Sequence, residues 1–466
     1  MKKELILKEI FRQNLIWDKD KEEFFYENKT YKRKLFFVLQ KYISKKQILS
    51  VVGLRRVGKT VLLKQLIKDI IEKSKINPKS ILFLSFDAAL VAENLTLNDY
   101  LSVYLENICP DSLKKIYIFL DEIQYIENWQ HILKRYYDSN PNIKFIISGS
   151  SSLFIRKKTT ESLAGRILEF KLNFLDFFEY LELTGKNEEL IGAYSRAALD
   201  IKRLDIKKIK SAKIEVENFL SRYQNKMLQY FSHYLALGQF PESALEPNYY
   251  DAEKYLKESV YKKTIEYDIP AIFGVDNVNR LKFLYDILIN ETGNEFELQN
   301  IASETGTTYK TLSDYLSYLK ESLLVDVVYG YTKSFRKSRR SIKKIYIAST
   351  NFYPLDSGAS EPLIINQILG HLAETYAYNL LKNNFNHIAI YKERNKEIDF
   401  VAADNLLDKN NFLFIEVKYK DDISKVKFDF LKRTASKISA LPYLILTKNN
   451  FDIRENGLAV PLYLLA

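Results

Sequence analysis

The chain is poor in the residues that build disulfide frameworks and cysteine-ligated metal centres. Its 466 residues include one cysteine, Cys109, and four histidines. A single cysteine excludes an internal disulfide or a cysteine zinc cluster, and it fits a reducing compartment. Only four histidines remain as nitrogen ligands for a metal.

Long uncharged apolar runs are also absent. None reaches the roughly 20 residues that a membrane-spanning helix needs. The first ten residues carry charges within their apolar stretch and lack a small-residue cleavage site, which argues against a secretory signal. We therefore expect a cytoplasmic protein with no membrane partner.

The composition is that of a folded, basic, multidomain protein. Hydrophobic residues make up 47% and charged residues 28%, and the length suggests about three domains. The formal net charge of +11 favours polyanionic partners. A bias toward Lys, Ile, Asn and Tyr is also what an AT-rich genome produces, so local basic clusters carry more weight than net charge.

Residues 49–60 form an apolar strand that runs into Gly53-x4-Gly58-Lys59-Thr60. This is the Walker A pattern, in which glycines let the backbone approach phosphates and a helix begins with its N–H groups facing them. An apolar helical face follows the motif, as the pattern requires. The expected nucleotide-binding run is Gly53, Leu54, Arg55, Arg56, Val57, Gly58, Lys59, Thr60 and Val61.

Alternating strand and helix signals continue after the motif. Strands at 80–86 and 115–120 flank a helix near 97–108. Short, continuously apolar strands between helices indicate a parallel sheet that is covered on both faces.

Two carboxylates, Asp121 and Glu122, end the second of these strands. Asp121 is expected to reach Mg²⁺ beside the Thr60 hydroxyl, which is the Walker B role. Glu122 is placed to orient and deprotonate the attacking water, while Lys59 contacts the β- and γ-phosphates. Taken alone, such an acid pair is typical of a solvated loop; following a Walker A motif, it predicts catalysis.

A further strand near 144–151 ends in hydroxyls. Ser148 and Ser150 are candidates to sense the γ-phosphate, and the alternative is a turn that caps the next helix. Arg166 is a candidate arginine finger, acting from the same or a neighbouring subunit, and a plain surface arginine is the alternative.

These residues resemble the bacterial and archaeal AAA-type P-loop ATPases that carry a nuclease-like C-terminal domain. The resemblance implies an ASCE-type sheet, hydrolysis of ATP with Mg²⁺, and a homo-oligomer. Two departures are Gln239, where the family usually has a second glycine, and a Lys-rich insertion at 186–225. The segments that carry the resemblance are Gly53–Thr60, Leu120–Gln124, Gly149–Ser152, Leu163–Arg166, Phe174–Tyr180 and Gly238–Glu242.

The middle of the chain predicts a helical insertion and lid, followed by a winged helix. Ala302, Gly306 and Leu312 have the spacing of a helix-turn-helix, and two strands follow. DNA contact would use Thr307, Thr308, Tyr309, Lys310 and Thr311 near a groove. Phosphate contact would use Lys333, Arg336, Lys337, Arg339 and Arg340 of the wing. Docking of a protein is the alternative.

The C-terminal region predicts a second site. Glu416 and Lys418 share one face of a strand, and Asp399 lies on the neighbouring strand. The two carboxylates suit Mg²⁺, Lys418 would position or help deprotonate a water, and Glu374 would complete the metal shell. This arrangement resembles the D…ExK motif of the PD-(D/E)XK restriction-endonuclease-like fold. Cleavage and an inert DNA clamp both remain open.

Together the patterns predict an α/β protein: a P-loop ASCE/AAA-type parallel sheet with a helical lid, a winged helix and a restriction-endonuclease-like domain. We expect an ATPase that couples nucleotide state to the binding or processing of nucleic acid, more naturally DNA than RNA. One rival is a nucleotide-dependent switch whose C-terminal modules bind a protein; another is a nuclease with a structural ATP site, which Glu122 disfavours. The expected domains are 1–30, 31–185, 186–275, 276–352 and 353–466.

Overall fold

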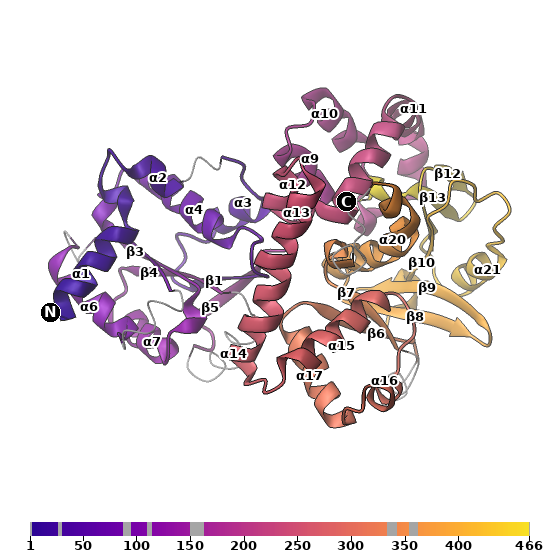
Figure 1. Ribbon diagram of the computed structural model, residues 1–466. Coiled ribbons are helices and arrows are strands. Elements are labelled where there is room, and N and C mark those ends of the chain that lie inside the picture. Colours follow the sequence, from indigo (N-terminus) through magenta and orange to yellow (C-terminus); the bar gives the residue numbers. More distant parts are fainter. Residues whose placement is uncertain are drawn as a thin grey trace. The chain divides into compact units, whose positions relative to one another are not determined.

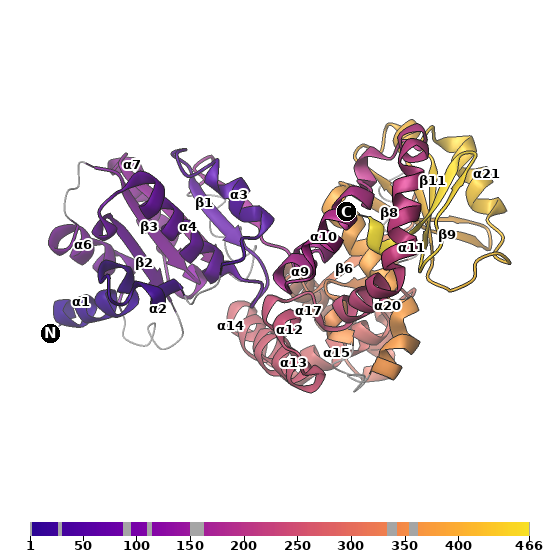
Figure 2. The same cartoon turned by 90° about the horizontal axis from the view of Figure 1, so that it is seen from above.

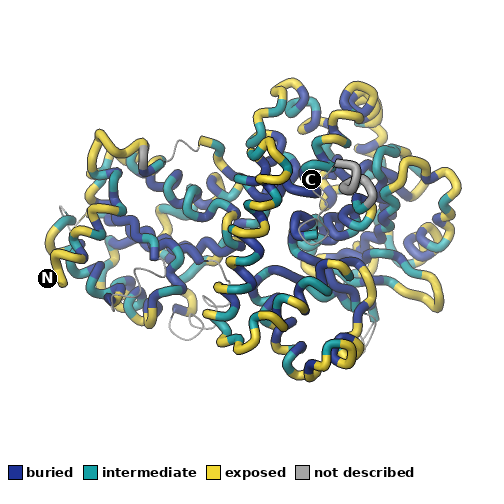
Figure 3. The backbone as a smooth tube through the Cα atoms, viewed as in Figure 1, coloured by how far each residue is buried: buried dark blue, intermediate teal, exposed yellow. Residues whose placement is uncertain are grey.

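The computed structural model describes residues 2–26, 30–86, 95–109, 114–149, 163–332, 343–353 and 362–465. The chain divides into two compact units, one ending at Asn173 and the other beginning at Phe174. The division falls before residue 185, where the sequence pattern puts the end of the ATPase core. Each unit has a sheet whose central strands are largely buried (Figure 3).

The first unit is a parallel sheet between two layers of helices. The strand order is β2-β3-β4-β1-β5, and every neighbouring pair is parallel. Helices α2, α3 and α4 cover one face, and α1, α6 and α7 cover the other (Figure 1). The bounds are α1 Lys2–Gln13, α2 Glu22–Tyr26, α3 Lys34–Gln40, β1 Ile48–Val52, α4 Lys59–Ser74, β2 Ile81–Ser85, α6 Leu97–Asn107, β3 Ile116–Asp121, α7 Trp129–Ser139, β4 Ile143–Gly149 and β5 Ile167–Lys171.

This sheet confirms the predicted parallel arrangement. Strands β1, β3 and β4 are buried at every position, as expected of strands covered on both faces. Because the strands are parallel, their carboxyl ends meet at one edge of the sheet. The P-loop, the acid pair and Ser148 therefore come together there.

The second unit begins with helices. The first, α9 Phe177–Leu183, lies within the range predicted for the ATPase core. Those of the predicted insertion and lid are α10 Glu188–Ala197, α11 Ile206–Leu237, α12 Pro241–Leu245, α13 Tyr249–Tyr255 and α14 Ile269–Phe273. Helix α11 packs along α20, Pro362–Asn384 (Figure 2). Between α13 and α14 the helix continues as a π-helix, Leu256–Asp268, whose wider turn the apolar spacing did not reveal.

A three-helix module with a two-stranded antiparallel sheet follows. It comprises α15 Val278–Asn290, α16 Leu298–Thr305, α17 Tyr309–Glu321, β6 Val325–Tyr329 and β7 Lys343–Ile347. Gly306 ends α16 with a φ of +61°, as the turn requires. Thr307 is buried and cannot enter a groove, whereas Thr308, Tyr309 and Lys310 are exposed. The predicted wing residues Lys333 to Arg340 lie outside the described residues.

The C-terminal sheet has the order β12-β13-β11-β10-β9-β8. After α20, three antiparallel strands follow one another, and a helix then leads to β11, which pairs parallel with β10. The bounds are β8 His387–Glu393, β9 Lys396–Ala403, β10 Leu413–Lys418, α21 Asp429–Ile438, β11 Tyr443–Thr447, β12 Asp452–Arg454 and β13 Gly457–Pro461. This order puts the predicted Asp399 and Glu416 on adjacent strands.

Candidate functional site

The loop between β1 and α4 has the geometry of a phosphate cradle. Arg56 and Gly58 adopt positive φ angles of 68° and 100°. A backbone of this kind turns N–H groups into a concave surface that binds anions. Helix α4 starts at Lys59, so the N–H groups of its first turn, including that of Val61, have no acceptor within the helix.

Gly53 is required for a reason beyond the expected approach of phosphates. A Cβ at this position would lie 2.4 Å from the carbonyl oxygen of Leu172, in the segment that leaves β5. The N–H of Leu172 donates to the Val52 carbonyl at 2.8 Å. The start of the loop is therefore packed against the exit of the sheet.

Lys59 crosses the loop from the start of α4. Its Nζ donates to the carbonyl oxygens of Gly53 at 3.1 Å and Leu54 at 3.2 Å. The same ammonium lies 3.4 Å from Oε1 of Glu122, and Lys59 is only 4% exposed. The structure thus brings the predicted phosphate lysine and the predicted catalytic glutamate together.

Asp121 and Thr60 form a compact group of oxygens. The Thr60 hydroxyl donates to Oδ2 of Asp121 at 2.6 Å, and the Ser148 hydroxyl donates to Oδ1. Burial, followed by the neighbouring charge of Glu122, raises the pKa of Asp121. A buried carboxylate beside a hydroxyl offers the hard oxygen ligands that Mg²⁺ prefers, so these residues fit the ion. Ser150 lies outside the described residues.

Both oxygens of Glu122 are engaged. Lys59 contacts one of them, and the side-chain amide of Gln124 donates to the other. Burial opposes ionisation, but Lys59 and Gln124 outweigh it and lower the pKa of Glu122. Glu122 also has a φ of +51°, a conformation that costs a non-glycine residue about 1 kcal/mol. The sequence analysis placed Gln124 in the segment Leu120–Gln124 that carries the family resemblance but gave it no role.

Arg33 is a further residue that the sequence did not reveal. It is 8% exposed and precedes α3. One terminal guanidinium nitrogen donates to the Val57 carbonyl at 3.0 Å and the other to the Asn173 carbonyl at 2.9 Å. Arg33 therefore ties the P-loop to the last residue of the first unit. A lone arginine before an apolar helix gives no local signal of this contact.

Arg166 lies at the amino ends of the parallel strands, whereas the P-loop lies at their carboxyl ends. Its carbonyl accepts a hydrogen bond from Ile48, the first residue of β1, and its guanidinium pairs with Asp138 at 2.9 Å. A five-residue strand rises about 16 Å, so the P-loop is roughly that far away within the same chain. Arg166 is not brought together with the other predicted ATP-site residues.

In the second unit, Asp399, Glu416 and Lys418 converge. Ile415 pairs with Phe400, so the next residues along, Glu416 and Asp399, lie side by side. The Nζ of Lys418 is 2.7 Å from Oε1 of Glu416 and 3.8 Å from Oδ2 of Asp399. The Val417 N–H also donates to Asp399, at 2.7 Å. The predicted motif is thus assembled within two neighbouring strands, just beyond the last paired residues Ile415 and Phe400.

Burial dominates the electrostatics of this pair. It raises the pKa of Asp399 to about 6 and that of Glu416 to about 7, although the charge of Lys418 opposes both shifts. Two carboxylates satisfy Mg²⁺ when phosphate oxygens and waters complete its shell, so the pair fits the ion.

Glu374 contacts two residues of β7. Its Oε1 accepts a hydrogen bond from the Tyr346 hydroxyl at 2.9 Å and lies 3.5 Å from Nζ of Lys344. Within the described ranges, no group of three or more histidine, cysteine, aspartate or glutamate side chains is arranged to hold a metal. Glu374 as a third ligand therefore stays a prediction.

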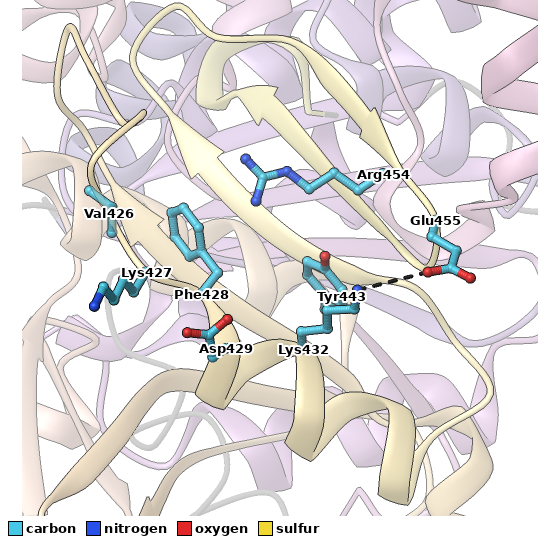
Figure 4. A pocket seen from close by; sticks show the side chains of 8 residues that line it. All are labelled: Val426, Lys427, Phe428, Asp429, Lys432, Tyr443, Arg454 and Glu455. Carbon is cyan, nitrogen blue, oxygen red and sulfur yellow. Dashed lines mark ion pairs between the residues drawn. The ribbon is translucent and has the colours of Figure 1, made fainter.

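A cavity of about 400 Å³ lies elsewhere in the same domain, between α21 and the β12–β13 hairpin (Figure 4). Phe428 and Tyr443 give it an aromatic floor, and Lys432 and Glu455 form an ion pair across its rim at 3.8 Å. Its lining residues include none of the carboxylate group just described. The full lining is Val426, Lys427, Phe428, Asp429, Lys432, Tyr443, Arg454 and Glu455.

Comparison with known families agrees with the first unit. Residues 45–181 match the family described as an AAA domain, and together with the parallel sheet this defines an AAA-type P-loop ATPase fold. Residues 228–353 and 369–465 match two domains of unknown function, DUF8612 and DUF4143. Among the described residues, no helix combines the length and apolarity needed to cross a bilayer.

The chain is also similar to other proteins along most of its length. It is 27% identical over 448 residues to the uncharacterized protein MJ1637 of Methanocaldococcus jannaschii, covering 93% of this chain and 88% of the relative. It is 26% identical to an uncharacterized protein of Haemophilus influenzae, covering 79% and 86%. A structure of the Aeropyrum pernix ORC1 protein in complex with DNA aligns with 77% of this chain and 96% of that one, at 11% identity and a TM-score of 0.31. At that level, the likeness carries no functional inference.

Proposed function

We propose that the first unit binds ATP and hydrolyses it. One observation carries the proposal: Lys59, Thr60, Asp121 and Glu122 meet at the carboxyl edge of a parallel sheet, next to a loop whose backbone suits phosphates. The AAA-domain match over residues 45–181 supports it independently.

Each residue has a role in this proposal. Lys59 gives up its contacts with the two loop carbonyls and with Glu122 and binds the β- and γ-phosphates instead. Glu122, freed from Lys59, orients and deprotonates the attacking water. Thr60 and Asp121 would hold Mg²⁺, which supplies positive charge to the phosphate oxygens. Ser148 keeps Asp121 in place through its hydroxyl.

Turnover measurements with Glu122→Gln test the proposal. We expect this variant to bind ATP and to hydrolyse it at least about 100-fold more slowly, because the amide cannot accept the proton of the water. The exposed Glu127→Gln serves as the matched control and should retain the wild-type rate. Wild-type turnover in Glu122→Gln would refute the catalytic assignment.

We further propose that the second unit acts on nucleic acid through a PD-(D/E)XK-like site. The support is the order of α20, three antiparallel strands, α21 and the parallel strand β11, with Asp399, Glu416 and Lys418 converging. Lys418 would hold the attacking water beside the pair. The helix-turn-helix of α16 and α17, with Tyr309 and Lys310 exposed, favours DNA as the partner.

Incubation of DNA with the protein and Mg²⁺ or Mn²⁺ tests this second proposal. Glu416→Gln and Lys418→Ala should each abolish cutting, and the exposed Lys432→Ala of the same domain should leave it unchanged. If the protein does not cut DNA and instead keeps a bound protein partner at every salt concentration tested, the result would favour the alternative hypothesis of a nucleotide-dependent adaptor.

A further inference from the structure

Lys344 places a buried positive charge beside the C-terminal carboxylates. It lies on β7, in the three-helix module rather than in the C-terminal sheet, and is 7% exposed. Its Nζ is 2.8 Å from Oε1 of Glu397 and 3.5 Å from Oε1 of Glu374. Lysines are rarely buried unless they are paired with an acidic group, and Lys344 has two such partners.

Tyr346, two residues further along β7, holds the same carboxylate. Its hydroxyl donates to Oε1 of Glu374 at 2.9 Å, and its ring stacks on Tyr378 of α20 with centroids 4.5 Å apart. Gly293 packs against the same carboxylate, because a Cβ on Gly293 would lie only 3.4 Å from Oε1 of Glu374. One oxygen of Glu374 is thus fixed by groups that all belong to the preceding module.

The charge of Lys344 extends to Asp399, one member of the carboxylate pair. Asp399 lies within electrostatic reach of both Lys344 and Glu374, and Lys418 sits between Asp399 and Glu416. A divalent cation at the pair would be repelled by Lys344, and it would meet only two carboxylates while Glu374 remains held by β7.

We propose that Lys344 and Tyr346 are positioning residues of the C-terminal site: they hold Glu374 apart from Asp399 and Glu416, and Lys344 lowers the affinity of the site for divalent metal. This inference rests on the proposed metal-dependent function of that site. It makes the three-helix module part of the site, and it gives a chemical reason why the third predicted ligand is not beside the other two.

Calorimetric titration of the full chain with Mn²⁺ tests the inference without using activity. Lys344→Met should bind Mn²⁺ about tenfold more tightly, because one repelling charge is removed and Glu374 loses a partner. Tyr346→Phe should bind about threefold more tightly, since one hydrogen bond to Glu374 is lost. Lys344→Arg, which keeps the charge, should retain the wild-type affinity, and so should the neighbouring Lys343→Met.

Removal of Lys344 leaves Glu374 and Glu397 without their cation, so folding is checked by thermal unfolding. If Lys344→Met fails to fold, Lys344→Met combined with Glu397→Gln restores the charge balance and should show the same gain in affinity.

The outcomes separate this inference from the proposal beneath it. Wild-type binding that Asp399→Asn abolishes, with a gain in Lys344→Met, supports both. Wild-type binding that Asp399→Asn abolishes, with unchanged affinity in folded Lys344→Met and Tyr346→Phe, overturns the positioning role alone. No Mn²⁺ binding by the wild type removes the metal site and this inference with it.

Discussion

Lys59 and Glu122 form an ion pair in the first unit, with Nζ and Oε1 3.4 Å apart. The lysine is bound by two loop carbonyls and the glutamate by Gln124. In the proposed function, phosphates that bind Lys59 would compete with its 3.4 Å contact to Glu122. Loss of that contact would leave the glutamate available to accept a proton from water.

The carboxylate pair predicts a pH dependence of stability. Burial raises the pKa of Asp399 to about 6 and of Glu416 to about 7, so the folded protein keeps protons that the unfolded chain has released. The pair's contribution to stability is therefore fully present below the ordinary pKa values of 3.8 and 4.5, and it is lost as the pH rises through about 6 to about 7. Urea unfolding at about pH 4 and about pH 8 should show a smaller loss between the two pH values for Asp399→Asn combined with Glu416→Gln than for the wild type. Equal losses would contradict the assigned shifts.

Single residues show what the sequence could and could not predict. Gly306 was predictable because a turn between helices demands a positive φ locally. The burial of Thr307 was not, since it depends on how α16 and α17 pack against α15. The partners of Glu374 come from β7, which is remote in sequence, so no local pattern could show them.

Among the elements, β1, the P-loop and α4 were predictable because the motif, the strand and the helix are contiguous. Contacts between elements that are remote in sequence were not predictable. The Gln239 side chain, for example, accepts hydrogen bonds from the Ser349 hydroxyl at 2.7 Å and the Thr350 N–H at 3.1 Å. The sequence flagged Gln239 as a departure from the family, and only the fold shows that it joins the end of α11 to the turn after β7.

Arg33 is expected to stabilise the P-loop and the end of the first unit. Arg33→Met would leave the Val57 and Asn173 carbonyls without its charged donors and should destabilise the first unit by about 2 kcal/mol. Because Val57 is part of the P-loop, the variant should also bind ATP more weakly. Denaturant unfolding and nucleotide titration measure the two effects.

The matched control is Arg12→Met, in an arginine of α1 that pairs with Glu9 at the surface. It should change stability by less than about 0.5 kcal/mol, as surface substitutions usually do. An Arg33 variant that behaves like the Arg12 control would rule out the bracing role.

At the scale of the whole molecule, the activity of Arg166 variants tests whether the protein acts as a monomer or as an assembly. It lies one strand length from the P-loop of its own chain, so the expected finger role requires a neighbouring subunit. Lys59→Ala and Arg166→Ala should each be inactive alone, and mixing them should restore part of the turnover. Under the finger hypothesis, the restoration would arise at interfaces where the Arg166 of one copy meets the intact P-loop of another.

The control is each variant assayed alone at the same total protein concentration as the mixture. Wild-type turnover by Arg166→Ala alone would show that this arginine is an ordinary surface residue paired with Asp138.

The central claim is that the first unit binds ATP through Lys59, and calorimetric titration with ATP and Mg²⁺ tests it most directly. The account predicts saturable binding by the wild type. It predicts binding at least about 100-fold weaker in folded Lys59→Ala, because a charge-assisted contact to phosphate is lost. No uptake by the wild type, or equal affinity in the two proteins, would contradict it.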